Sequence, residues 1–346
     1  MSPFIIPVFL PQAGCPHQCV FCDQVAITGV KKNSDPVEEL RASMRRFSGF
    51  KTKKNRSRQV SFYGGNFLGQ RPKIIRALLT EAENYVTAGK IDSIRFSTRP
   101  DTIRAETLDI LESHSVKTVE LGVQSMDDAV LSMSRRGHSS LDTETAAGLL
   151  KQRGYEIGAQ LMTGLPGDSD EKARLTAEKV AELSFDFARI YPTLLFRGSA
   201  LATWHTRGDY VPSSLDQTVS LVMDMYLSLT EKNIPVIRMG LQAGEGLEIG
   251  SQILGGPWHP AFGHLVHSKI FLEKASAAIK SAENISDSLS LKVNPASVSK
   301  LIGMKKNNMF QLKKRFHLKS IQVVCDPCMG RDDVHAVFKG DLTSPT

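Results

Sequence analysis

Apolar and polar positions follow two alternating patterns along the first two thirds of the chain. Short apolar runs, each as long as a buried strand, recur six times. These runs lie at 4–10, 59–63, 93–98, 118–123, 156–163 and 187–196. Segments with helical spacing of apolar residues lie between and after them, at 36–47, 72–88, 103–114, 127–134, 142–153 and 170–183. The alternation predicts repeated strand–helix units and therefore a parallel sheet.

Six strand–helix units suit a partial barrel of the TIM type, an α/β fold in which helices cover parallel strands. After residue 200 the rhythm weakens, and the pattern predicts a helix at about 214–232, a strand at 236–239 and a helix near 264–283. We therefore expect a partial (βα)6 barrel as the core domain at residues 1–234, followed by a C-terminal α/β extension at residues 235–346.

Glycine and polar residues come at the ends of several predicted strands. They are Gly64-Gly65-Asn66, Thr98-Arg99, Gln124-Ser125 and Thr163-Gly164. In parallel α/β folds the carboxyl ends of the strands carry the ligand site. We therefore expect these four segments to meet around a ligand.

Composition argues against two classes of protein. No run of eighteen apolar residues occurs, so the sequence predicts no membrane-spanning helix. The run 4–10 lacks a basic leader and a small-residue cleavage site, which favours a buried strand over a signal peptide. Five cysteines, three of them close together, do not form the paired framework of a secreted domain. We expect a reducing compartment, the cytoplasm.

The net charge of +7 is concentrated in two segments. Residues 31–58 hold ten Lys and Arg against three acidic residues, and residues 292–319 hold eight and no acidic residue. Segments of this kind attract polyanions such as RNA. A solvated helix face or a mobile loop is the alternative interpretation.

Cys15, Cys19 and Cys22 follow the first predicted strand with Cys-x3-Cys-x2-Cys spacing. Three thiolates in one short loop can bind three corners of a cubane [4Fe-4S] cluster. The fourth iron is then open to a ligand that chelates it through an amino and a carboxylate group. The alternative is a zinc site with His17 as fourth ligand, but His17 lies only two residues from Cys15 and from Cys19, which is cramped for a tetrahedron.

With its later motifs, the chain resembles the radical S-adenosylmethionine (SAM) superfamily. The resemblance is to the group that contains the catalytic subunit of Elongator and the oxygen-independent coproporphyrinogen III oxidases, over roughly residues 4–245. Seven segments in the same order carry it: Cys15–Cys22, Phe62–Asn66, Thr98–Asp101, Glu120–Ser125, Arg136–His138, Thr163–Asp168 and Arg189–Thr193. Residues 235–346 contain no acyl-CoA loop sequence, so we expect no acetyltransferase domain there.

The resemblance implies a [4Fe-4S] cluster and S-adenosyl-L-methionine as cofactors. Cys15, Cys19 and Cys22 would be the cluster ligands and the catalytic residues. The reduced cluster would pass one electron to the sulfonium, which gives methionine and a 5′-deoxyadenosyl radical that abstracts hydrogen from a substrate. The electron donor would be a reductant protein of the flavodoxin or ferredoxin type.

The resemblance also implies how the methionine part of SAM is bound. Gly64 and Gly65 would present backbone groups to its amino end, because only glycine lets the backbone come so close. Gln124 and Arg136 would hold the methionine part, since the fork of an arginine suits a carboxylate. Arg135 is the alternative to Arg136.

The remaining contacts to SAM would come from other strand ends. Ser97 and Gln160 lie where the coproporphyrinogen oxidases carry acidic residues for the ribose, and both keep hydrogen-bonding groups. The segment Gly164–Pro166 would flank the adenine. Phe21 would shield the cluster and could pack on the adenine.

The Elongator-like motifs imply an RNA substrate, a tRNA uridine, and thus tRNA modification; the basic segments agree with this. The alternatives are a coproporphyrinogen oxidase-like enzyme and a non-catalytic haem-binding relative. Two further cysteines, Cys325 and Cys328, are too few for a second cluster unless His317, His335 or another chain contributes. For this pair we favour a structural or incidental role.

Overall fold

The computed structural model describes residues 3–24, 35–47, 49–50, 56–241, 249–282 and 287–338. It divides the chain into two compact units. The first unit is made of Met1–Thr218 and Met225–Trp258, and the second of Val219–Asp224 and His259–Thr346. The first unit continues to Trp258, and the domain boundary after residue 234 stays a prediction.

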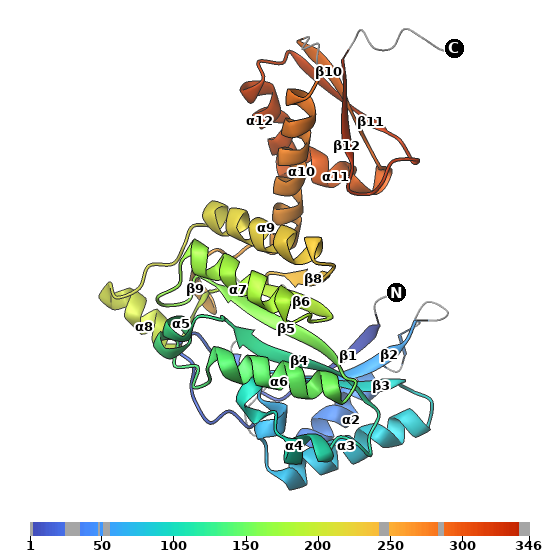
Figure 1. The fold of residues 1–346 in the computed structure, drawn as a ribbon, viewed down its shortest axis with the longest axis vertical. Coiled ribbons are helices and arrows are strands. Elements are labelled where there is room, and N and C mark those ends of the chain that lie inside the picture. Colours follow the sequence, from blue (N-terminus) through green and yellow to red (C-terminus); the bar gives the residue numbers. More distant parts are fainter. Residues whose placement is uncertain are drawn as a thin grey trace. The chain divides into compact units, whose positions relative to one another are not determined.

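The first unit is built on a seven-stranded parallel sheet in which neighbouring strands follow one another in sequence. Its strands, in order across the sheet, are β1 (Phe4–Phe9), β2 (Arg58–Tyr63), β3 (Ser93–Thr98), β4 (Val116–Gln124), β5 (Glu156–Thr163), β6 (Phe187–Pro192) and β8 (Val236–Met239). The predicted partial barrel is confirmed (Figure 1). The seventh strand, β8, lies beyond the predicted boundary because its pairing with β6 is a tertiary contact.

Helices follow the strands and cover the outer face of the sheet, because right-handed crossovers in one direction place them all on one side. They are α2 (Pro36–Phe47), α3 (Pro72–Thr87), α4 (Ala105–Asp109), α5 (Asp128–Met133), α6 (Ser140–Gln152) and α7 (Asp170–Glu182). Ser139 and Ser169 begin α6 and α7 by accepting a bond from a first-turn amide. The helix predicted at 103–114 is shorter than expected, since turns after Asp109 bring Leu111 into the core beside Leu108.

The two faces of the sheet differ sharply in polarity. The outer face carries apolar side chains against the helices, among them Val60, Phe62, Ile94, Phe96, Val119, Leu121, Ile157 and Ala159. The inner face carries buried polar and charged side chains at the alternate positions, among them Gln59, Ser61, Arg95, Ser97, Thr118 and Glu120. Apolar and polar positions alternate along each strand because the helices pack against the outer face of the sheet. The polar inner face can then form a site.

Beyond β6 the chain departs from the strand–helix rhythm. The predicted strand 187–196 is two elements, since β6 ends at Pro192 and β7 (Leu195–Phe196) pairs antiparallel with β9 (Ile253–Gly255). Helix α8 (Ala200–Arg207) was not predicted, and helix α9 (Leu215–Glu231) lies where it was expected. Two- and three-residue strands carry no period of their own, so only their distant partner defines them.

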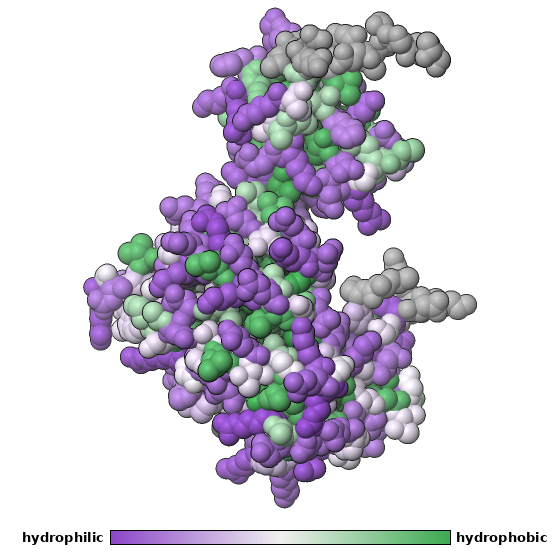
Figure 2. All heavy atoms as spheres, viewed as in Figure 1, coloured by the Kyte–Doolittle hydropathy of each residue, from purple (hydrophilic) through white to green (hydrophobic). Residues whose placement is uncertain are grey.

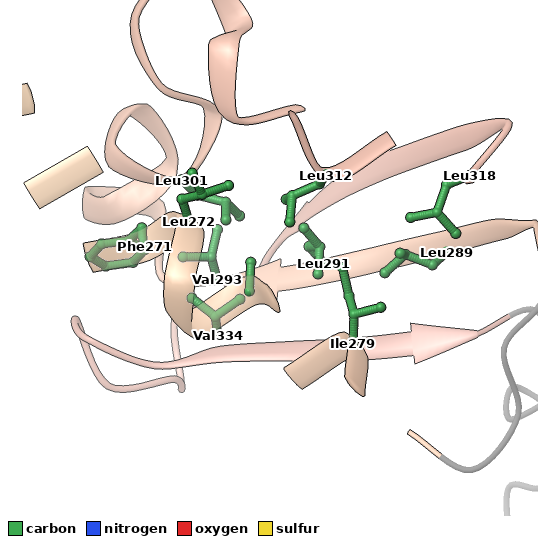
Figure 3. Packing of buried hydrophobic residues seen from close by; sticks show 11 residues of the cluster. Phe271, Leu272, Ile279, Leu289, Leu291, Val293, Leu301, Leu312, Leu318 and Val334 are labelled. Atoms are coloured by element: carbon green, nitrogen blue, oxygen red, sulfur yellow. The ribbon is translucent and has the colours of Figure 1, made fainter. Parts of the chain in front are cut away.

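The second unit contains the expected α/β extension. Its elements are α10 (Phe262–Lys280), β10 (Ser288–Val293), α11 (Val298–Ile302), α12 (Asn307–Arg315), β11 (Ser320–Cys325) and β12 (Val334–Phe338). β10 is the central strand, parallel to β11 and antiparallel to β12. Figure 3 shows apolar side chains of β10, α10, α11 and α12 meeting in one core around Leu291. In the described part of the chain no helix has the length and apolarity needed to cross a membrane.

Two glycines of the first unit should respond in opposite ways to alanine. A Cβ on Gly158 of β5 would lie 2.2 Å from the Phe187 ring, whereas a Cβ on Gly148 of α6 would meet nothing within 4 Å. We expect Gly158→Ala to lower the free energy of unfolding by about 1–3 kcal/mol through overpacking. We expect Gly148→Ala to raise it by up to about 1 kcal/mol through helix propensity. Urea unfolding followed by circular dichroism measures both variants. Equal changes in the free energy of unfolding would contradict the close contact of Gly158 with the Phe187 ring.

Candidate functional site

The loop that carries the three cysteines leaves β1 and is fixed by the turn after β2. The Gln12 amide donates to the Gly64 carbonyl at 2.7 Å, and the Asn66 amide donates to the Ala13 carbonyl at 2.8 Å. A Cβ on Gly65 would lie 2.5 Å from the Ala13 oxygen. Gly64 has a φ of +88°, which favours glycine. The glycine pair therefore lets the turn after β2 pack directly against the cysteine loop.

The fully buried Asn66 side chain joins three segments. Its Nδ2 donates to the Gly14 carbonyl at 3.0 Å, while its Oδ1 accepts from Thr98 Oγ1 at 2.6 Å and from the Arg99 amide at 3.1 Å. These bonds tie the ends of β2 and β3 to the cysteine loop. The sequence placed Asn66 in a segment expected at the ligand but gave its side chain no partner, although an amide directly after a Gly-Gly pair was a usable signal.

Cys15, Cys19 and Cys22 are free thiols on this loop. Desolvation raises the pKa of Cys15 although this residue reaches the surface, and burial together with the neighbouring thiols Cys19 and Cys15 raises the pKa of Cys22 to about 12. The three groups are thus close enough to resist one another's ionisation. Thiolates in such a place require a bound cation or cluster to compensate their charge.

The arrangement is unfavourable for the zinc alternative. The His17 ring packs against Gly137, where an added Cβ would lie 2.3 Å from its Cδ2. Within the described ranges, no three His, Cys, Asp or Glu side chains are arranged to hold a metal ion. The position of the His17 ring against Gly137 therefore gives no support to His17 as a zinc ligand, and the cluster assignment of the three thiols stays a prediction.

Arg136 lies beside the cysteine loop, and its Nε–H is among the donors it does not use. Its buried guanidinium donates from Nη2 to the Gly122 carbonyl at 2.7 Å and from Nη1 to Cys19 Sγ at 3.4 Å. Its Nε is buried and has no hydrogen-bond partner. A Cβ on Gly122 would lie 2.5 Å from Arg136 Nη2 and 2.8 Å from Gln124 Nε2, so this glycine leaves room for both side chains. The structure thus brings Gln124 and Arg136 together, and the spare donor fits a carboxylate.

The neighbouring Arg135 points elsewhere. Its guanidinium is exposed and lies 5.8 Å from the centre of the Trp204 ring. His138, two residues after Arg136, has a pKa of about 3 because burial and the Arg136 and Arg99 charges disfavour its cation. Of the two arginines that the sequence left open, Arg136 is the one at the cysteine loop.

Phe21 and the segment Gly164–Pro166 lie near the same end of the sheet but are held by apolar and backbone contacts. The Phe21 ring is half-buried against a cluster of Val20, Leu195 and Leu201. The Gly164 carbonyl accepts from Tyr210 Oη at 2.5 Å. These contacts fix the Phe21 ring and the loop after β5.

Ser97 and Gln160 are joined to each other on the inner face. Gln160 Nε2 donates to Ser97 Oγ at 2.9 Å and to Glu120 Oε2 at 3.0 Å. A narrow hollow beside Ser97 is lined also by Leu10, Ala13, Tyr63, Gly65 and Asn66. Ser97 and the cysteine loop therefore border the same space.

Glu120 is the centre of a buried charged network that the sequence analysis did not assign to the site. Its carboxylate pairs with Arg95 Nε at 2.6 Å and with Arg189 Nε at 2.8 Å, and it accepts from Tyr63 Oη at 3.1 Å. Burial alone would raise its pKa, but the Arg189 and Arg95 charges hold the pKa below its ordinary value. Burial and the Glu120 charge raise the pKa of Tyr63 to about 12. Charged residues at alternate positions of predicted strands were the signal that could have revealed this network.

Removal of the Glu120 charge should destabilise the first unit strongly. Glu120→Gln leaves Arg95 and Arg189 as buried, uncompensated cations, so we expect the free energy of unfolding to fall by about 3–5 kcal/mol. In the control Glu112→Gln, the side chain is 60% exposed and pairs with Arg153 at the surface, so we expect almost no change. Urea unfolding at neutral pH measures both, and similar losses would show that the Glu120 network is not structural.

The Glu120 network should also make the free energy of unfolding depend on pH in the acidic range. Because the folded pKa of Glu120 is lowered, its contribution is complete above the unfolded pKa of about 4.3 and is lost as the pH falls through the folded pKa. We expect the wild type to lose this contribution below about pH 4, and Glu120→Gln to lack that component of the pH dependence.

Comparison with known proteins places the chain in a family. Residues 9–180 match the model of the radical SAM superfamily, and residues 185–271 match that of the radical SAM C-terminal domain. The first match contains the cysteine loop, the turn after β2, Gln124 and Arg136.

Curated proteins similar to the chain carry several names. An uncharacterised protein of Methanocaldococcus jannaschii is 27% identical over 64% of this chain and 70% of its own length. A tRNA uridine(34) acetyltransferase of Dehalococcoides mccartyi is 26% identical over 61% of this chain and 53% of its own length. A heme chaperone HemW of Lactococcus lactis is 24% identical over 67% of this chain and 61% of its own length. The chain spans about half the length of the acetyltransferases that it matches.

Among solved structures, the Elp3 of Methanocaldococcus infernus with an N-terminal deletion has the same fold, with a TM-score of 0.60 and 22% identity. The similarity covers 78% of this chain and 63% of that one. The two family models and this fold agree with the position of the three thiols at the carboxyl edge of a parallel half-barrel. The chain therefore belongs to the radical SAM superfamily, whose enzymes bind a [4Fe-4S] cluster and S-adenosylmethionine.

Proposed function

We propose that this radical SAM enzyme binds its [4Fe-4S] cluster through Cys15, Cys19 and Cys22 and modifies RNA, specifically a tRNA uridine. The observation that carries the cluster assignment is the loop of three free thiols next to a buried arginine with an unused donor. The substrate class is supported by the similar proteins named tRNA uridine(34) acetyltransferase and by the two basic segments. The electron donor in this proposal is a flavodoxin or ferredoxin.

The chemistry that the cluster supplies when bound is one-electron cleavage of S-adenosylmethionine to methionine and a 5′-deoxyadenosyl radical. The chain's own residues bind and orient the cofactor. Arg136 can give its free Nε–H to the carboxylate, while one N–H of Nη1 and one N–H of Nη2 are engaged with Cys19 and Gly122. Gln124 is held next to it by a left-handed backbone, with a φ of +66°.

The ribose is assigned to Ser97 and Gln160. Glu120 is ionised and accepts from Gln160 Nε2, so the amide of Gln160 is fixed with its nitrogen toward Glu120. Its Oε1 is then the atom that can accept from a ribose hydroxyl. In this way an amide oxygen takes the part that an acidic residue has in the coproporphyrinogen oxidases.

The second candidate is a haem-binding protein, because the chain is similar to a heme chaperone HemW over 67% of its length. A haem-binding role alone would not require a cluster loop and a carboxylate-binding arginine in the same site. Haem titration and the assay of 5′-deoxyadenosine formation distinguish the two. Haem binding without any 5′-deoxyadenosine would favour the second candidate.

Replacement of the cysteines should separate cluster ligands from the other thiols. We expect Cys15→Ala, Cys19→Ala or Cys22→Ala to lose the cluster and all 5′-deoxyadenosine formation. We expect the double variant Cys325→Ala/Cys328→Ala to keep four irons per chain, because both thiols are exposed and β10 lies between β11 and the His335 strand β12. Iron and sulfide quantification of anaerobically reconstituted protein checks this. Iron loss from the double variant would instead indicate a second cluster.

Substitution of the two adjacent arginines should affect SAM binding differently. We expect Arg136→Lys to weaken SAM binding by about tenfold or more, because an ammonium cannot keep the Gly122 and Cys19 bonds and also bind the carboxylate. We expect Arg135→Lys to change it little, since that side chain is exposed over Trp204. Equilibrium binding of SAM to the reconstituted protein is the measurement. Equal effects would remove Arg136 from the site.

The substrate class is tested by anaerobic incubation of the reduced enzyme with bulk tRNA and SAM, followed by nucleoside mass spectrometry. We expect a new modified uridine that depends on SAM and on Cys19. An unchanged nucleoside profile from an enzyme that forms 5′-deoxyadenosine would exclude tRNA as the substrate while leaving the radical chemistry intact.

A further inference from the structure

Helix α12 of the second unit is anchored by one face only. Asn308 and Leu312 are buried and lie one turn apart. Asn308 Nδ2 donates to the Ser268 carbonyl at 2.8 Å and to the Lys300 carbonyl at 3.2 Å. Leu312 enters the core beside Leu291 (Figure 3). The opposite face of α12 is therefore left to solvent.

That opposite face carries an aromatic ring among lysines. Phe310 is 67% exposed, although a phenylalanine in a folded domain is usually buried. Lys313 and Lys314 are exposed and stand three and four residues after it, the spacings that make neighbours on a helix, and the exposed Lys306 immediately precedes the helix. We name these four residues the α12 face. Figure 2 shows hydrophilic residues over most of the visible surface of the second unit, with apolar residues in small groups.

The charges of the α12 face are not used within the chain. Nearby basic residues are paired, since Arg315 lies 3.5 Å from Glu273 and Lys319 lies 2.5 Å from Asp287. In the part of the chain that the structure describes, Lys306, Lys313 and Lys314 have no acidic partner. Residues 292–319 also contain no acidic residue that could neutralise them.

Two lysines directly before α12 have a strained, left-handed backbone. Lys305 and Lys306 have φ values of +50° and +62°, a left-handed conformation that costs an L-residue about 1–2 kcal/mol. Glycine would adopt it without that cost. Strain of this kind is characteristic of functional positions.

We propose that the α12 face binds single-stranded RNA, with a base stacked on Phe310 and phosphates held by Lys306, Lys313 and Lys314. Exposed aromatic rings beside basic side chains are the usual platform for unpaired bases. A membrane surface would need a wider apolar stripe than one ring on a nine-residue helix provides. An acidic peptide would use the lysines but would not need the ring. This inference rests on the proposed RNA substrate and adds a binding surface to it.

The ring is tested with the full-length reconstituted protein and a fluorescent single-stranded polyuridine, by anisotropy. We expect Phe310→Ala to raise the Kd about five- to tenfold, because one stacked base is lost. We expect Phe310→Trp to restore binding and Phe310→Leu not to restore it, since leucine keeps apolar area but has no π-face. Wild-type affinity in Phe310→Leu would overturn the stacking proposal in favour of an apolar contact.

The lysines are tested by the salt dependence of the same binding. Each phosphate contact to a single strand contributes about 0.7 to the slope of log K against log salt. We expect the triple variant Lys306→Gln, Lys313→Gln, Lys314→Gln to reduce that slope by about 2. The matched control removes three exposed lysines of the first unit, Lys73→Gln, Lys117→Gln and Lys232→Gln, and should change the slope much less. Equal reductions would overturn the proposal, because they would indicate only a general charge effect.

The same binding measurements distinguish an error about the α12 face from an error about the RNA substrate. If the wild type binds RNA and Phe310→Ala binds it equally well, only the α12 face is excluded. If the wild type binds neither polyuridine nor tRNA, the RNA substrate is excluded together with the α12 face. Formation of 5′-deoxyadenosine without RNA and the melting temperature should be unchanged in every variant, which shows that the cluster site and the fold are intact.

Discussion

The ion pairs of Glu120 are the interaction on which the first unit depends. A half-barrel with all its helices on one side leaves the inner face of its sheet without an apolar layer. One carboxylate on β4 bonds to Tyr63 on β2, Arg95 on β3 and Arg189 on β6, and through Gln160 to β5. Such a network is costly to desolvate, but it is stable only when every partner is in place. It therefore fixes five strands in one arrangement.

The site lies at the carboxyl edge of this framework. Gln160 donates hydrogen bonds to both Glu120 and Ser97. Ser97 lies next to the hollow that Gly65 and Asn66 also line. Asn66 in turn holds the start of the cysteine loop through the Gly14 carbonyl. Hydrogen bonds of Gln160 and of Asn66 thus hold the two sides of this hollow, one joined to the buried charges and the other to the cysteine loop.

The second unit is held together by an apolar core instead of a buried charged network. Apolar residues of α10, α11, α12 and β10 pack around Leu291 without a buried ion pair among them. Because Asn308 and Leu312 are enough to hold α12, its outer face is free to carry Phe310 and lysines. The residues of the candidate site thus lie in the first unit, and the α12 face lies in the second.

The sequence by itself determined the parallel half-barrel and the cysteine loop. Strand and helix periods are local, and thiol spacing within one loop needs no distant contact. Glycines and polar residues at strand ends likewise predicted the edge at which Gln124 and Arg136 lie next to Gly122. Only the tertiary structure decided that β8 joins the sheet, that β7 pairs with β9, and that Arg136 rather than Arg135 reaches the thiols. It alone revealed Glu120 as the central residue, because a carboxylate in a strand pattern acquires its meaning from partners on other strands.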